Sequence, residues 1–265
     1  MSPLVPPHDA AFAVATAVVS LGVASIYLYV ADRIFGRTVS SPARLASIQL
    51  ALFWGGLGAT ILLDALEMGL ALANAFPLAA ALTFTVVADV IAVVALWALV
   101  GFLTYVYTGR YHLPELGVIY AAFFVIAIYY TFAQAPIGVA FVDGLPAIQY
   151  SVAAIPWLSA VVIVLLVGPE LVGALLYLSL VRRTRIAEQR GRIWLVGGAI
   201  LLWMALDIFV PATSGPLLLV RTLLEVIPGL MILAAFYPPA WAQRRFGLPD
   251  EPIPAPESAD RGVHP

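Results

Sequence analysis

The sequence contains no cysteine and no lysine, and it has few charges of either sign. Without cysteine, disulfides, thiolate metal sites and cysteine nucleophiles are all excluded. Only 11% of the 265 residues are charged, whereas 63% are hydrophobic. A soluble domain of this length has roughly a quarter of its residues charged, because its surface contacts water. The composition therefore indicates that lipid surrounds most of the chain.

Seven apolar runs are long enough to cross a bilayer, which takes about 20 residues of helix. The expected fold class is all-α, an integral membrane bundle of seven transmembrane helices within residues 1–246. A proline-rich, polar tail at 247–265 is expected to be disordered and cytoplasmic. No basic region precedes the first run, so we expect no cleavable signal peptide. The expected spans are Ala10–Ala31, Leu45–Glu67, Pro77–Thr108, Leu116–Ala140, Pro156–Val181, Ile193–Pro211 and Leu217–Tyr237.

The arginines predict the orientation of the bundle. Twelve of the 13 lie in alternate links between spans or after the last span, and the remaining links contain none. Links rich in arginine stay in the cytoplasm, so this side is predicted to be cytoplasmic. With an odd number of spans, the N-terminus is outside and the C-terminus inside. We expect a multi-pass protein of the cell membrane, whose partner is the lipid bilayer and not nucleic acid.

Ionisable side chains inside the spans are the main functional signal, because each costs about 2.5–3.5 kcal/mol at the bilayer centre on insertion scales. A helical rise of about 1.5 Å per residue, counted from the cytoplasmic arginines, puts them in the middle or outer half of the membrane. Several share a helix face with other polar or aromatic residues. We expect them to bound a cavity that opens to the outside and takes a small ligand or cation. The candidate site residues are Asp89, Gln134, Glu170, Trp203, Asp207, Arg221 and Glu225.

Arg221 is the strongest candidate, since an arginine at this depth needs an acidic partner. The nearest choices in sequence and depth are Asp207 and Glu225. The remaining carboxylates are either protonated, bound to a cation, or simply hydrogen-bonded to a neighbouring helix. Pro169 and Pro228 are expected to interrupt the fifth and seventh spans, because each removes a backbone hydrogen bond.

Cofactor and enzyme chemistry find no support. A covalent retinal pigment needs a lysine for its Schiff base, and the chain has none. The three histidines, His8, His112 and His264, lie in tails or a loop, so neither a bis-histidine haem nor a zinc site is expected. The chain also lacks a Gly-x-Ser-x-Gly elbow. We therefore expect no enzyme and no cofactor.

Three short motifs, Tyr105–Arg110 (YVYTGR), Arg190–Gly198 (RGRIWLVGG) and Tyr237–Trp241 (YPPAW), resemble the seven-helix sensor modules at the N-terminus of bacterial and archaeal histidine kinases. The resemblance implies a prokaryotic membrane sensor. Those sensors continue into a signalling domain, which this sequence lacks, so a separate cytoplasmic or membrane protein is the implied recipient of the signal. The expected docking residues are Arg182, Arg183, Arg185, Arg190 and Arg192.

Three functions stay open from the sequence. The first is a stand-alone seven-helix receptor or sensor whose outward-facing polar cavity binds a small ligand or ion. The second is a small transporter or channel coupled to protons or a cation. The third is a structural or accessory subunit of a membrane complex, in which polar residues pin helices together.

Overall fold

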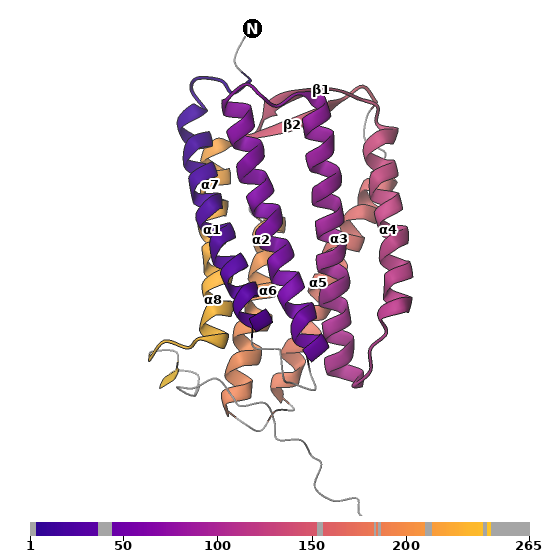
Figure 1. Cartoon of the computed structure of the whole chain (residues 1–265), viewed down its shortest axis with the longest axis vertical. Helices are drawn as coiled ribbons and strands as arrows, with labels where there is room; N and C mark the ends of the chain where they lie inside the picture. Colours follow the sequence, from indigo (N-terminus) through magenta and orange to yellow (C-terminus); the bar gives the residue numbers. More distant parts are fainter. Residues whose placement is uncertain are drawn as a thin grey trace, which may run out of the picture.

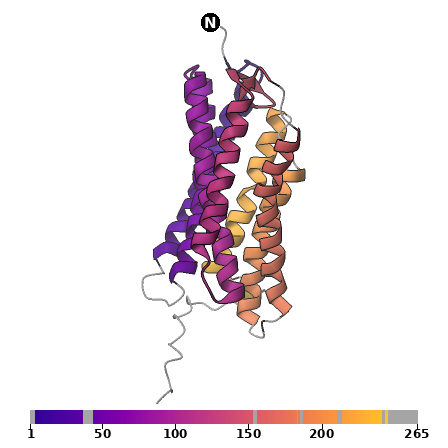
Figure 2. The same ribbon diagram turned by 90° about the vertical axis from the view of Figure 1, so that its right-hand side faces the viewer.

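The computed structural model describes residues 4–36, 44–152, 156–182, 184, 187–209, 214–240 and 243–244. Long helices lie side by side in a bundle, with two short strands at one end (Figures 1 and 2). The helices are α1 (Ala10–Gly36), α2 (Arg44–Leu72), α3 (Leu78–Thr108), α4 (Leu113–Ala133), α5 (Pro156–Ser179), α6 (Ala187–Phe209), α7 (Gly215–Leu224) and α8 (Val226–Phe236), and a short 3-10 helix, η2 (Leu180–Arg182), follows α5. The strands are β1 (Pro136–Val142) and β2 (Leu145–Tyr150).

The length and apolar composition of the helices suit a membrane. Among the described residues, five helical segments are long and apolar enough to cross one, namely α1 to α4 and the joined α7–α8 segment Gly215–Phe236. Helices α5 and α6 occupy the fifth and sixth expected spans. The seven-helix bundle is therefore confirmed, while the number of crossings and the orientation stay predictions. The expected tail at 247–265 lies outside the described residues.

The fourth expected span ends too late. Helix α4 stops at Ala133, and the residues from Pro136 to Ala140 belong to β1 instead. Pro136 has no N–H to donate and disfavours helical backbone at Ala135, which adopts a φ of 48°. The chain then forms an antiparallel hairpin in which Val142 pairs with Leu145.

The turn of this hairpin is Asp143–Gly144, whose φ angles are 52° and 89°. Positive φ at both central residues is the geometry that two-residue hairpin loops require, and Asp-Gly is a preferred sequence for it. The sequence predicted only a link between spans around Asp143, so the hairpin is an addition to the expected all-α bundle.

The two ends of the bundle differ in chemistry. The hairpin lies across the end where α1 begins and α2 ends, which we call the hairpin end (Figure 1). The opposite end, which we call the arginine end, carries Arg33, Arg44, Arg110 and Arg182 where their helices begin or end. There the guanidinium of Arg33 lies 5.0 Å from the ring centre of Tyr29. Of the described arginines, Arg221 alone lies in the half of the bundle nearer the hairpin.

Large rings fill the middle of the bundle. Tyr27 and Trp54 are fully buried and stack with ring centres 5.7 Å apart. Trp203 meets Tyr27 edge-on at 5.6 Å, and Phe53 packs edge-on against Trp54 at 4.8 Å. We call these four residues the aromatic layer. Offset and edge-on pairs of this kind stabilise a core beyond the area they bury.

The two expected proline interruptions have different outcomes. The seventh span is broken into α7 and α8 at Glu225, three residues before Pro228. Because proline has no N–H, the carbonyl one turn earlier loses its helical partner, and the break falls there. The fifth span is not broken: α5 runs continuously through Pro169, in contrast to the expectation. Helices packed against neighbours tolerate proline in this way.

Candidate functional site

The site is built around the ion pair of Arg221 and Glu225 on α7 and at its break. The Arg221 Nε donates to the Glu225 Oε1 at 3.1 Å. The side chains of Arg221 and Glu225 are 25% and 9% exposed, so the protein covers most of this pair. Spacing of four residues puts both on one helix face, which is the arrangement that the sequence predicted for this pair. Of the two acids expected as partners of Arg221, the structure places Glu225 against it.

This pair borders a small pocket between α1, α2 and α7, which we call the polar pocket. Its volume is about 100 Å³. Helix α1 contributes two hydroxyl side chains, α2 contributes a carboxylate, and α7 with its break contributes the ion pair and a third hydroxyl. These polar lining residues are Thr16, Ser20, Asp64, Arg221, Thr222 and Glu225.

The hairpin covers the polar pocket at the hairpin end. Leu145 of β2 lines the pocket directly and packs in one apolar cluster with Met68 and Leu218. The turn rests on the start of α7: a Cβ on Gly144 would come within 2.7 Å of the Gly215 Cα. Only glycine permits this approach of two backbones. The sequence predicted a cavity that opens to the outside; in the structure the hairpin lies over the polar pocket at the hairpin end, and which side of a membrane this end faces stays a prediction.

Tyr27 connects the polar pocket to the aromatic layer. Its hydroxyl donates to the main-chain carbonyl of Glu225 at 3.1 Å, and both residues are buried. This bond partners a backbone group at the break between α7 and α8, where the regular helical pattern is lost. The break is therefore tied to α1 and to the rings that pack around Tyr27.

Asp89 lies in a separate polar group toward the hairpin. It is half-buried on α3 and interacts electrostatically with the phenol of Tyr150 on β2. Burial raises the pKa of Tyr150, and Tyr130 and Asp89 add to that increase. Gln134 is buried at the end of α4, where its amide donates to the Tyr130 carbonyl at 3.2 Å. These residues do not line the polar pocket.

The other predicted site residues divide in the same way. Trp203 belongs to the aromatic layer and not to the pocket lining. Glu170 and Asp207 lie on α5 and α6, and their side chains fall outside the described part of the structure. Their role in a site stays a prediction. The pocket residues Thr16 and Ser20 were missed, although their spacing of four residues on an apolar helix was visible in the sequence.

The predicted docking arginines are described only in part. Arg182 and Arg190 are exposed at the arginine end. Arg192 is half-buried on α6 and interacts electrostatically with Tyr177. Arg183 and Arg185 lie outside the described residues. Partner docking at these positions is untested.

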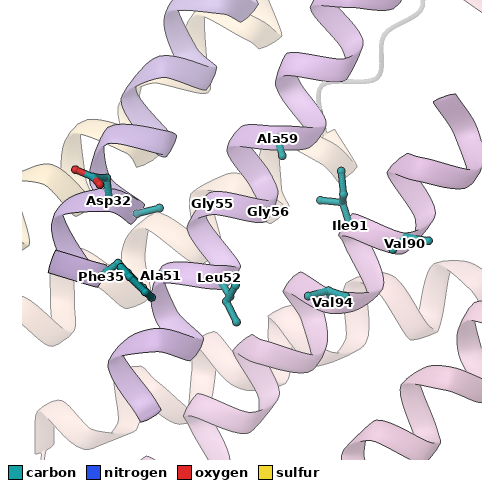
Figure 3. A pocket seen from close by; sticks show the side chains of 11 residues that line it. Asp32, Phe35, Ala51, Leu52, Gly55, Gly56, Ala59, Val90, Ile91 and Val94 are labelled. Atoms are coloured by element: carbon teal, nitrogen blue, oxygen red, sulfur yellow. The ribbon is translucent and has the colours of Figure 1, made fainter. Parts of the chain in front are cut away.

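A larger hollow lies on the outer surface of the bundle. It is a groove of about 470 Å³ across α1, α2 and α3, lined by small and aliphatic side chains such as Gly55, Ala59 and Val94 (Figure 3). The carboxylate of Asp32 at its edge points away from the other labelled side chains (Figure 3). Gly56 in this groove allows α2 to approach α3, because a Cβ there would lie 2.6 Å from the Ala95 Cβ. The groove has almost no polar group that could orient a ligand, so the polar pocket is the better candidate site.

Comparison with known proteins bears on the fold. The chain is similar to squid rhodopsin in its crystal structure, with a TM-score of 0.51 and 12% sequence identity over 92% of this chain and 89% of that chain. No protein-family model matches the sequence. No curated protein matches it either. At this level of identity the likeness establishes the fold, which is a seven-helix membrane module. The resemblance to histidine-kinase sensors stays a prediction.

Proposed function

We propose that this chain is a receptor-like protein of the cell membrane that binds a small ligand or ion in the polar pocket. In this proposal all seven helical rods cross the bilayer, with the hairpin end and N-terminus outside and the arginine end in the cytoplasm. The arginines described at the ends of α1, α2, α3 and α5 support this orientation, since links rich in arginine stay inside.

The observation that carries the proposal is the ion pair of Arg221 and Glu225 facing a covered pocket. Placing a charged pair at this depth costs free energy. Such a pair is therefore expected where it serves a binding site or pins helices together. Here the pair borders space that is also lined by hydroxyl groups from α1. A pair that only pinned helices would be expected to close on its partners and leave no polar space beside it.

The position of the pair also suits signalling. Glu225 marks the break between α7 and α8, and Tyr27 holds its carbonyl. A ligand that alters the carboxylate therefore acts on a discontinuous helix, and α8 continues from this point to the arginine end. Broken helices beside charged residues commonly form binding sites or hinges in membrane proteins.

The aromatic layer favours a receptor over a transporter. A transport route from the pocket toward the cytoplasm has to pass the buried rings of Tyr27, Trp54 and Trp203, which pack against one another. The arginine-rich link after α5 remains the proposed docking surface for a separate signalling partner, as the resemblance to kinase sensors implies.

Single-cysteine labelling tests this proposal, and the natural chain has no cysteine to interfere. An impermeant thiol reagent is applied to intact cells that express Asp143→Cys, Thr16→Cys or Val18→Cys. We expect rapid labelling at 143 in the exposed turn and slow labelling at 16 under the hairpin. Val18 is 63% exposed on α1 and faces acyl chains in this proposal, so its thiol should not ionise or react.

Each variant has a result that contradicts the proposal. An unreactive Asp143→Cys would place the hairpin end in the cytoplasm. Equal reactivity of Thr16→Cys and Val18→Cys would show that the pocket differs in no way from the lipid-facing surface. As an internal check, Gly144→Ala should displace the hairpin turn and accelerate the labelling of Thr16→Cys.

A further inference from the structure

Another hollow, which we call the side groove, lies between α3, α4 and α5. These three helices contact one another at one side of the bundle (Figure 1). The groove has a volume of about 530 Å³, which falls within the roughly 300–1,000 Å³ of pockets that hold small molecules. It shares no lining residue with the polar pocket. A ligand of the side groove is therefore distinct from a ligand of the polar pocket.

The side groove runs along the helices from the arginine end. On α3 its lining extends from Val100 to Thr108, which is the last residue of that helix. On α5 it extends from Gly168 to Leu176. At about 1.5 Å per residue, each stretch rises about 12 Å, and one leaflet provides about half of the 30 Å hydrocarbon core of a bilayer. In a bilayer the groove therefore spans about one leaflet, with its mouth near the headgroups.

The interior of the side groove suits hydrocarbon. Its lining consists mainly of aliphatic and small side chains, such as Leu103 and Val172. Gly168 leaves space there, because no neighbouring atom lies within 4 Å of the position that its Cβ would take. The hydroxyl of Thr104 already donates to the Val100 carbonyl at 2.7 Å. Water in the groove would therefore find few hydrogen-bond partners, and an apolar chain is favoured.

The mouth of the side groove is polar. The Tyr107 hydroxyl donates to the Leu176 carbonyl at 2.7 Å and is also hydrogen-bonded to the Ser179 hydroxyl. Thr108 lines the mouth as well, and its hydroxyl accepts from the Arg110 main-chain N–H at 3.1 Å. An apolar interior with a polar mouth matches a molecule that has a hydrocarbon chain and a polar head.

Two exposed arginines flank this mouth. Arg110 lies two residues after the end of α3, and Arg182 ends η2. The bond between Tyr107 and Ser179 brings these two chain segments together. Among the described residues at these ends of α3, α4 and α5, Glu115 in the first turn of α4 is the one acid. Positive charge is therefore in excess at the mouth, which favours an anionic head.

From the apolar interior, the polar mouth and the two arginines, we infer that the side groove binds one anionic phospholipid. An acyl chain fills the groove along α3 and α5, and the phosphate lies at the mouth near Arg110 and Arg182. The inference rests on the proposed function only in that the chain crosses a bilayer. The lipid adds packing surface to α4, which is the least buried of the five long apolar segments. Binding should therefore stabilise the bundle.

The test uses the purified full chain in detergent and measures its melting temperature against the mole fraction of added lipid. Phosphatidylglycerol is compared with phosphatidylcholine of the same acyl chains, and with inorganic phosphate at constant ionic strength. We expect a saturable rise with phosphatidylglycerol, a weaker response to phosphatidylcholine and none to inorganic phosphate. The reason is that the groove binds the acyl chain while the arginines favour the anionic head.

Two substitutions test the headgroup contact. Arg110→Gln and Arg182→Gln should each weaken the apparent affinity for phosphatidylglycerol about 5-fold, since a basic residue near an anionic lipid surface contributes about 1 kcal/mol. Without added lipid both variants should melt like the natural chain, because both arginines are exposed. Arg44→Gln is the matched control: it changes an exposed arginine of α2, a helix that does not line the groove, and should keep the natural affinity.

A third substitution tests the acyl-chain contact. Gly168→Leu places a side chain in the open space of the groove, and leucine favours helix more than glycine does. It should abolish the saturable response to both lipids. Gly22→Leu is the matched control, because Gly22 is equally open but lies on α1, outside the groove. If Gly168→Leu does not fold, Val172→Phe fills the same groove from the same helix and decides the result.

Equal responses to phosphatidylglycerol and phosphatidylcholine would overturn the inference, as would a full response in the folded groove-filling variant. An affinity loss in Arg44→Gln as large as in Arg110→Gln would show diffuse attraction to the arginine end and no site. A rise with inorganic phosphate equal to that with phosphatidylglycerol would show that an ion, and not a lipid, is bound. These failures leave the proposed function intact, because that proposal is tested separately by cysteine labelling at positions 143, 16 and 18.

Discussion

The polar pocket and the aromatic layer follow one another along the interior of the bundle, and they are built in opposite ways from the same helices. Helix α1 provides Thr16 and Ser20 to the pocket and Tyr27 to the layer. Helix α2 provides Asp64 to the pocket and Trp54 to the layer. The pocket has charged and hydroxyl side chains around an empty volume, whereas a few helical turns away the layer has large rings in close contact.

The difference separates binding from stability. Rings that pack at centre distances below 6 Å hold the helices together and leave no space for a ligand. The polar pocket does the reverse, since it keeps charged groups beside space that only another polar species fills well. Changes in the layer should therefore lower stability without altering ligand response, and changes in the pocket should alter both.

The largest expected effect is in the aromatic layer. Trp54→Ala removes a fully buried ring and two ring contacts, and should lower the free energy of unfolding by about 3–5 kcal/mol. Thermal unfolding in detergent measures the loss. The slow labelling of Thr16→Cys should persist at temperatures where the variant is folded. A changed labelling rate of Thr16→Cys in a folded Trp54→Ala protein would break the separation of layer and pocket.

Arg221→Ala tests the pocket. Removing one partner of a buried ion pair costs roughly 3–5 kcal/mol, and the 25% exposure of the Arg221 side chain puts the expected loss at the low end. Arg110→Ala, at an exposed arginine of the arginine end, should change the melting temperature little. Equal changes in melting temperature for the two substitutions would show that the ion pair of Arg221 contributes no more to stability than an exposed arginine does.

Gly144→Ala tests the hairpin that covers the pocket. The new Cβ would meet the Gly215 Cα at 2.7 Å, and the φ of 89° is one that L side chains rarely adopt. We expect a loss of about 1–2 kcal/mol. Gly138→Ala is the matched control in the same hairpin, where the nearest atom lies at an ordinary 3.6 Å. A loss in Gly138→Ala as large as in Gly144→Ala would argue against docking of the turn.

The smallest expected effect is at the junction of the two regions. Tyr27→Phe keeps the ring in the layer and removes the hydrogen bond to the Glu225 carbonyl. The loss should be about 1 kcal/mol, because only one hydrogen bond disappears. Tyr129→Phe, at an exposed tyrosine of α4, serves as control. If Tyr27→Phe leaves the free energy of unfolding unchanged, the junction has no energetic role.

Sequence alone predicted the bundle because apolar runs of about 20 residues with few charges are typical of helices that cross a membrane. It failed at the end of the fourth span for the same reason. Ile137, Val139 and Phe141 continue an apolar run, and only Pro136 and the Asp143–Gly144 turn distinguish a hairpin from a helix. The hairpin packs against apolar neighbours and is half-buried. Its composition therefore resembles that of a membrane-spanning helix.

The site was predictable where it depended on one helix. Arg221 and Glu225 are four residues apart, and helical geometry brings them together. Asp89, Gln134 and Trp203 were grouped with them because polar faces avoid lipid. That rule does not say which interior neighbour each helix faces, since rotation about the helix axis is decided by packing. The contribution of α1 through Thr16 likewise depends on its tertiary contact with α7.

A double-mutant cycle on Arg221 and Glu225 tests the central claim most directly. The free energies of unfolding of the natural chain, Arg221→Ala, Glu225→Ala and the double variant give the coupling energy between the two side chains. A pair enclosed in the polar pocket should give a coupling above about 1.5 kcal/mol, because charge-assisted hydrogen bonds away from water are strong. A coupling of about 0.3–0.5 kcal/mol, typical of exposed pairs at this spacing, would contradict the account.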